Sequence, residues 1–127
     1  MTIELAQADD ASVTGDRELL EYAIYNLLTN AVKYSPAGSI VTVKSERAGD
    51  QLRLSVADRG MGMDAAEVKH IFDKFYRTKR AEAAGIEGTG IGLSIVQEII
   101  RHHGGRLEVA SRPGHGSCFT LILPAKL

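Results

Sequence analysis

The apolar residues of the chain follow a helical period in two segments. In the first segment they recur at spacings of three and four: Leu20, Ile24, Leu27, Leu28 and Ala31. This period predicts an amphipathic helix that begins after an N-cap at Asp16, runs to about residue 34 and is ended by Ser-Pro-Ala-Gly at 35–38. A second helix is expected at 92–103, because the glycine pair at 104–105 would end it.

Elsewhere apolar and polar residues alternate, which is the pattern of half-buried strands. The first alternating segment predicts a short strand at 2–8. Two further pairs of segments flank turn residues and predict hairpins, one with strands at 40–43 and 52–56 and the other with strands at 106–111 and 117–123.

A short third helix is expected between the two hairpins. Asp64 is followed three residues later by Glu67, the spacing of a capping box, and the helix should run to about residue 72. Residues 77–88 mix alanine, glycine and charge without a period, so we expect a mobile loop there. Three helices and several antiparallel strands, without regular strand–helix alternation, predict a two-layer α+β sandwich.

Composition narrows the class of protein. With 127 residues, 44% hydrophobic and 24% charged, we expect one domain over residues 1–127. No apolar stretch reaches the roughly 18 residues of a membrane span, so we expect a soluble, cytoplasmic chain without such a span. The net charge of -1 argues against a nucleic-acid partner, and the single Cys118 excludes a disulfide within the chain.

Thirteen glycines are present, and five of them fall in two short clusters: Gly60, Gly62, Gly88, Gly90 and Gly92. The second cluster lacks the Gly-Lys-Ser/Thr ending of a P-loop, and it follows an expected loop where a dinucleotide-binding motif would follow a strand. Its glycines alternate at the entry to a helix, where free N–H groups and the helix dipole favour anionic oxygens. Taken alone, each cluster is a weak signal and is more typical of a plain turn than of a ligand site.

Polar side chains beside these clusters suggest a ligand. Asp58 precedes the first cluster at the end of an expected strand, where its carboxylate would accept a hydrogen bond from an amino group such as that of adenine. Asn26, Asn30 and Lys33 share one face of the long helix, and a carboxamide oxygen suits Mg²⁺. A solvated polar stripe on the helix is the alternative for these three residues.

Four motifs occur in a fixed order at 26–36, 58–62, 71–77 and 88–94, and together they resemble the catalytic ATP-binding domain of bacterial sensor histidine kinases. The likeness covers nearly the whole chain. It implies a Bergerat-type (GHKL) sandwich, in which a mixed, mostly antiparallel sheet packs on about three helices. ATP would lie between the long helix and a flexible lid at about 77–88.

The resemblance also implies roles for individual residues. Asn30 would hold Mg²⁺, Asp58 would bind the adenine amino group, and Tyr34 would lie against the adenine. The residues with implied catalytic roles are Asn26, Asn30, Lys33 and Arg77. Further nucleotide contacts are implied for Tyr34, Asp58, Gly60, Gly62, Met63, Ile71, Phe75, Gly88, Thr89, Gly90, Ile91, Gly92 and Leu93. Arg59 departs from the asparagine common after this aspartate, which leaves a side-chain role there without support.

The resemblance also bears on the reaction. Relatives of this fold that hydrolyse ATP place a glutamate general base four residues before the metal asparagine, and here that place is Asn26. An amide cannot take the proton, so transfer to another nucleophile is favoured over hydrolysis. We therefore expect the chain to donate the γ-phosphoryl group of Mg²⁺-ATP to a histidine.

The acceptor is expected on another domain. None of the four histidines has the setting of a phosphoacceptor, so the histidine-bearing dimerisation hairpin of the same kinase is expected to be absent from this chain. The expected partners are that hairpin and a downstream response regulator. Alone, the chain should bind ATP and phosphorylate nothing in itself. The alternatives are an anti-sigma-type serine kinase, a non-catalytic nucleotide-sensing module and a pure interaction domain.

Overall fold

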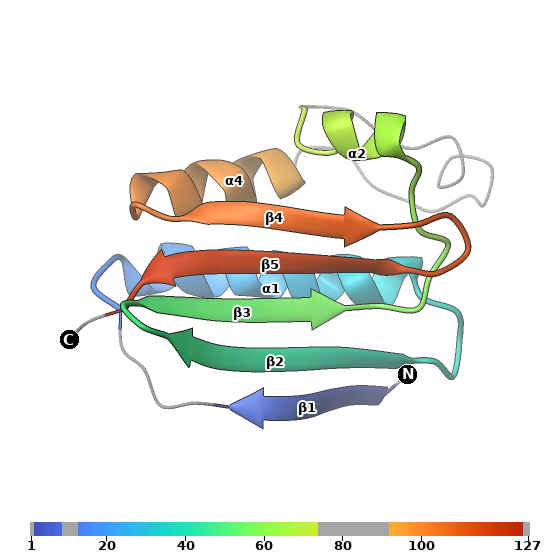
Figure 1. Ribbon diagram of the computed structural model, residues 1–127, viewed down its shortest axis with the longest axis horizontal. Coiled ribbons are helices and arrows are strands. Elements are labelled where there is room, and N and C mark those ends of the chain that lie inside the picture. Colours follow the sequence, from blue (N-terminus) through green and yellow to red (C-terminus); the bar gives the residue numbers. More distant parts are fainter. Residues whose placement is uncertain (1, 9–12, 74–91, 126–127) are drawn as a thin grey trace.

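A computed structural model of the chain describes residues 2–8, 13–73 and 92–125 (Figure 1). Its sheet has five strands in the order β1-β2-β3-β5-β4. Strand β1 is parallel to β2, and the other neighbours are antiparallel, which confirms a mixed, mostly antiparallel sheet. The strands are β1 (Thr2–Ala8), β2 (Ile40–Ala48), β3 (Gln51–Ala57), β4 (Arg106–Ser111) and β5 (Ser117–Pro124).

Three helices belong to the described residues: α1 (Arg17–Tyr34), α2 (Ala65–His70) and α4 (Gly92–His102). Helices α1 and α4 pack against each other, and both contact the sheet, α1 at β3 and α4 at β4 and β5. This arrangement confirms the two-layer α+β sandwich. None of these helices is long and apolar enough to cross a membrane.

The core lies between the helices and the sheet. Leu20, Ala23, Leu27 and Ala31 of α1 follow the helical period and are all buried. They form one cluster with buried residues of α4 and the strands, among them Val56, Val96, Ile100, Phe119 and Leu121. Because burial of a leucine or isoleucine side chain contributes about 1.5–3 kcal/mol, this seam holds the two layers together.

Both expected N-caps are present. The Asp16 carboxylate accepts a hydrogen bond from the Leu19 N–H, and Asp64 and Glu67 form a complete capping box at the start of α2. Helix α2 is shorter than expected: it ends at His70, and residues 71–72 continue as a turn in which the Asp73 N–H donates to the His70 carbonyl. The expected loop at 77–88 lies outside the described residues.

The topology gathers distant segments at one end of the sandwich. The end of β3, the C-terminus of α1, the N-terminus of α4 and the β4–β5 turn all lie at the end where α2 is found (Figure 1). The N-terminus of α1, the C-terminus of α4 and the end of β5 meet at the opposite end. Asp58, Gly60 and Gly62, which follow β3, therefore belong to the first of these ends.

Candidate functional site

Asp58 directly follows β3 and is only 9% exposed. Its Oδ1 atom accepts hydrogen bonds from the N–H groups of Gly60, at 2.8 Å, and Ser117, at 3.2 Å. Burial raises the pKa of the Asp58 carboxyl, and these two N–H groups oppose the rise. Within the part of the chain that the structure describes, no group donates to Oδ2. A buried acceptor without a donor is unfavourable, so Oδ2 is a candidate ligand contact.

The backbone around Asp58 packs too closely for side chains. A β-carbon at Gly60 would clash with the carbonyl oxygen of Tyr34, so the loop after β3 lies directly against the end of α1. Gly62 adopts a φ of 68°, and a β-carbon there would clash with the Arg112 carbonyl. The two glycines therefore allow the Asp58 loop to fit between α1 and the β4–β5 turn.

The β4–β5 turn supports Asp58 from the other side, which the sequence analysis missed. The Asp58 N–H donates to the Ser117 carbonyl at 2.8 Å, and the Gly114 N–H donates to the Met61 carbonyl at 2.8 Å. Gly116 has a φ of 80°, and a β-carbon there would clash with the Asp58 carbonyl. The available signal was the Gly-His-Gly spacing directly before β5, which marks a backbone needing both unusual dihedral angles and close approach.

The polar stripe of α1 extends toward α4. The Asn26 side-chain amide donates to the Tyr22 carbonyl at 2.9 Å. A β-carbon added at Gly92, the first residue of α4, would lie 3.4 Å from the Asn26 Oδ1 atom. The structure therefore brings Asn26 and Gly92, two residues predicted to lie at the phosphates of the nucleotide, next to each other.

Asn30 and Lys33 complete the stripe at spacings of four and seven residues from Asn26. Asn30 is half-buried and Lys33 is exposed. Neither side chain forms a hydrogen bond or ion pair with any described residue. Both are available for a ligand, and Tyr34 ends the same helix beside Gly60.

Three apolar residues predicted to contact nucleotide belong to the core or its edge. Met63 is 6% exposed within the core cluster, and Ile71 and Leu93 are half-buried against it. Their contact with a nucleotide stays a prediction. Six further predicted site residues lie outside the described residues: Phe75, Arg77, Gly88, Thr89, Gly90 and Ile91.

The donor set fits a magnesium ion held together with phosphates. Among the described residues, no group of three or more His, Cys, Asp and Glu side chains is placed to bind a metal. Mg²⁺ does not require such a cluster, since it commonly binds through one or two protein oxygens, substrate phosphates and water. The Asn30 carboxamide, which has no partner among the described residues, can supply one such oxygen.

Comparison with known proteins identifies the family. A family model described as histidine kinase-, DNA gyrase B-, and HSP90-like ATPase matches residues 15–127. The chain belongs to this family. It is 42% identical to the sensor-like histidine kinase SenX3 of Mycobacterium tuberculosis (strain ATCC 25618 / H37Rv), over 89% of this chain and 28% of that protein. It is equally identical, at 42%, to the signal transduction histidine-protein kinase AtoS of Escherichia coli (strain K12), over 88% of this chain and 18% of that protein.

The solved structures that resemble this chain are also histidine kinases. The mycobacterial sensor histidine kinase MprB superimposes with a TM-score of 0.83 and 31% identity, covering 98% of this chain and 83% of that one. Full-length ShkA in complex with AMPPNP gives a TM-score of 0.80 and 29% identity, covering 97% of this chain and 26% of that one. The chain is therefore a catalytic ATP-binding domain of the sensor histidine kinase type. It spans less than a third of the length of the curated relatives it matches.

Proposed function

We propose that this chain binds Mg²⁺-ATP and donates the γ-phosphoryl group to a histidine on a separate helical hairpin of a two-component sensor kinase. The buried Asp58 carboxylate is the observation that carries the proposal. Its Oδ1 is held by two backbone N–H groups, while Oδ2 has no donor among the described residues. The 6-amino group of adenine would supply that donor, in a charge-assisted hydrogen bond.

The phosphates would lie along the polar stripe of α1. Lys33 has no ion-pair partner among the described residues and would contribute positive charge, and Asn26 would present its Oδ1 atom beside the start of α4. The first N–H groups of α4 lack partners within the helix and favour anionic oxygens. Mg²⁺, held by Asn30, would supply charge neutralisation when bound. Arg77 is expected to add to it from outside the described residues.

Transfer is favoured over hydrolysis at this site. Hydrolysis by water benefits from a general base, and Asn26 stands where that base would be needed. Its amide group is already committed to the Tyr22 carbonyl and cannot accept a proton. A neutral imidazole has a nitrogen lone pair and needs no such base. The nitrogen would form the new bond to the γ-phosphorus as the bond to the β-phosphate oxygen breaks, with ADP leaving and the imidazole proton passing to solvent.

Two of the chain's own histidines are engaged elsewhere. His70 Nδ1 lies 2.9 Å from Asp73 Oδ2, and both His103 ring nitrogens are hydrogen-bonded to backbone. This supports an acceptor on another domain. The proposed partners are therefore the histidine-bearing hairpin and a response regulator that takes the phosphoryl group onward. We infer that residues 1–127 act as one catalytic unit, with residues 77–88 as its lid.

The test is phosphorylation of a supplied hairpin. The chain is incubated with Mg²⁺, γ-labelled ATP and a cognate histidine hairpin, with a hairpin in which alanine replaces the histidine as control. Label that requires the histidine and is lost in acid is expected, because phosphohistidine is acid-labile. Acid-stable label on serine would support the anti-sigma-type kinase instead. ATP binding without label would contradict the transfer reaction and favour a nucleotide-sensing module.

A further inference from the structure

The hydroxyl of Ser111, the last residue of β4, joins the segments that surround Asp58. It accepts a hydrogen bond from the Met63 N–H at 2.8 Å and donates one to the Gly116 carbonyl at 3.0 Å. It also lies 2.8 Å from the Ser117 hydroxyl. A hydroxyl has one proton and two lone pairs, so donating to Gly116 and accepting from Met63 and Ser117 uses its whole capacity.

Each partner of Ser111 bears on the position of Asp58. Met63 closes the loop that begins at Asp58, and it is itself buried. Gly116 lies against the Asp58 carbonyl, and the Ser117 backbone both donates to Asp58 Oδ1 and accepts from the Asp58 N–H. The Ser111 hydroxyl is therefore bonded to both segments that hold the carboxylate, although it does not touch the carboxylate.

We propose that Ser111 is a positioning residue for nucleobase recognition. By joining the loop to the β4–β5 turn, it keeps Oδ1 on the backbone N–H groups and leaves Oδ2 free for the 6-amino group of a purine. This inference rests on the proposed function, since it assumes that the Asp58 carboxylate binds adenine. Without the hydroxyl, the Met63 N–H loses its hydrogen bond and the Gly116 carbonyl keeps only the long one from the Arg112 N–H, at 3.5 Å. A buried donor without an acceptor is unfavourable, so we expect the loop and the turn to move apart or to admit water.

The chain offers matched variants. Ser111→Ala removes the hydroxyl, and Ser111→Thr keeps it at a strand position where threonine is well tolerated. Ser55→Ala is the control, because Ser55 also shares a hydroxyl pair across the sheet, with Thr120 at 3.1 Å, and Asp58 is not part of that pair. Ser111→Cys serves if the alanine variant does not fold, since it keeps the size of serine and donates only weakly.

The experiment measures the affinity of each variant for ATP and for purine riboside 5′-triphosphate, which lacks the 6-amino group. Ser111→Ala is expected to weaken ATP binding about fivefold to tenfold, the loss of one hydrogen bond to the ligand, and to change binding of the analogue less than twofold. Ser111→Thr and Ser55→Ala should bind both ligands as the unchanged chain does.

The two proposals fail in different ways. If Ser111→Ala weakens both ligands equally, or neither, while the unchanged chain still prefers ATP to the analogue, the positioning role is wrong and the proposed function stands. If the unchanged chain binds neither ligand, or does not distinguish them, adenine recognition by Asp58 fails and the role of Ser111 fails with it.

Discussion

At each end of the sandwich a side chain forms hydrogen bonds with backbone that is distant in the sequence. The two ends differ in whether every polar atom of that side chain has a partner. At one end, His103 Nε2 accepts from the Asp16 N–H at 3.0 Å and its Nδ1 lies 2.7 Å from the Ile99 carbonyl. Both ring nitrogens are thus used. At the other end, Asp58 uses one oxygen on Gly60 and Ser117 and leaves the second without a described partner.

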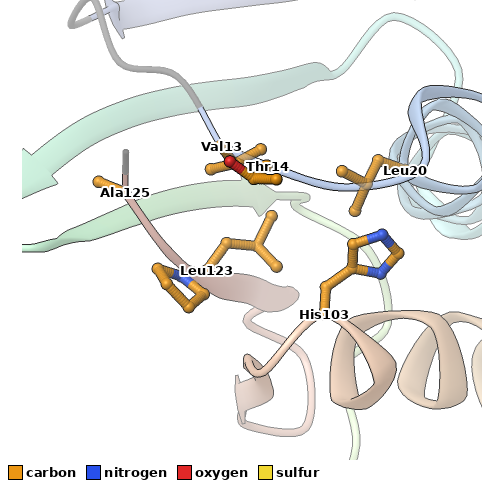
Figure 2. Close-up of a pocket in the computed structure, with 7 residues that line it drawn as sticks. Val13, Thr14, Leu20, His103, Leu123 and Ala125 are labelled. Atoms are coloured by element: carbon orange, nitrogen blue, oxygen red, sulfur yellow. The ribbon is translucent and has the colours of Figure 1, made fainter. Parts of the chain in front are cut away.

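The surroundings of His103 indicate a structural role, in which the ring connects the end of α4 to the chain before α1. Beside the ring lies a cavity of about 130 Å³, lined by residues of three segments, among them Val13 from the chain before α1, Leu20 from the first turn of α1 and Leu123 from β5 (Figure 2). A β-carbon at Gly15 would clash with the ring, so the chain before α1 packs directly on it. A polar side chain whose donors and acceptors all have protein partners serves to connect segments of the fold. A buried side chain with an acceptor atom that lacks a donor is instead a candidate for ligand binding. The contrast separates a structural end, at His103, from the end that we propose binds ATP, at Asp58, which is called the binding end below.

Gly116→Ala should produce the largest effect at the binding end. Gly114 and Gly116 both have positive φ, at 77° and 80°, but only Gly116 lies against Asp58; nothing lies within 4 Å of a β-carbon added at Gly114. Gly116→Ala should lower the free energy of unfolding by about 2–4 kcal/mol and abolish measurable ATP binding, because strain and overpacking add. Gly114→Ala should cost about 1 kcal/mol and leave affinity unchanged. Urea unfolding and calorimetry check both, and equal effects would show that the packing against Asp58 is unimportant.

Asp58→Asn should weaken ATP binding without lowering the stability of the fold. The asparagine oxygen can still accept from Gly60 and Ser117, but its amide group would face the adenine amine, donor against donor. ATP affinity should fall at least tenfold, about 1.4 kcal/mol, while the thermal midpoint stays the same or rises. Titration calorimetry measures the affinity. Unchanged affinity would rule out Asp58 as the adenine contact and support a pure interaction domain.

His103→Phe should have the opposite effect to Asp58→Asn: it should lower stability and leave ATP affinity unchanged. Phenylalanine keeps the bulk of the ring and removes both hydrogen bonds, so the free energy of unfolding should fall by about 1–2 kcal/mol. ATP affinity should stay within twofold, because the ring lies at the other end of the fold. His102→Phe is the matched control, since His102 is exposed. A loss of ATP affinity in His103→Phe with the protein still folded would contradict the division into a structural end and a binding end.

The smallest expected effect is a pH dependence from Asp58. Its folded-state pKa is raised by burial, so the folded protein holds this proton more tightly than the unfolded chain. The contribution of Asp58 to stability is therefore largest at low pH and is lost as pH rises from the ordinary aspartate pKa through the raised one. Thermal midpoints of the unchanged chain and Asp58→Asn should converge as the pH is lowered through this interval. Parallel curves would mean that the carboxyl is not perturbed.

Local signals in the sequence predicted the elements well. The three- and four-residue spacing of Leu20 to Ala31, the Asp16 cap and the Asp64–Glu67 capping box each involve residues within a few positions of one another, and the structure has α1 and α2 where they indicate. The motif order was also sufficient to identify the family, which the comparisons confirm. The alternative of a solvated stripe at Asn26 is weakened, because that side chain faces the start of α4.

Local signals of this kind predict neither the order of the strands in the sheet nor the backbone groups that hydrogen-bond to Asp58. Strand β5 lies between β3 and β4, and β1 joins the sheet beside β2 in parallel. Pairing between strands depends on which surfaces are buried together, and an alternating pattern is compatible with several partners. For the same reason the sequence of the turn at 112–116 predicts a hairpin connection but not its contact with Asp58.

The sequence alone indicated which residues would carry the proposed chemistry: a carboxylate after a strand, amides and a lysine on one helix face, and glycines in two clusters. Only the tertiary structure decided how that chemistry is presented. Ser117 is 59 positions from Asp58 along the chain, yet its N–H donates to Oδ1 and leaves Oδ2 for the ligand that we propose. Periodicity and caps are local interactions that the sequence displays directly, whereas this hydrogen bond exists only because the sheet places β5 beside β3.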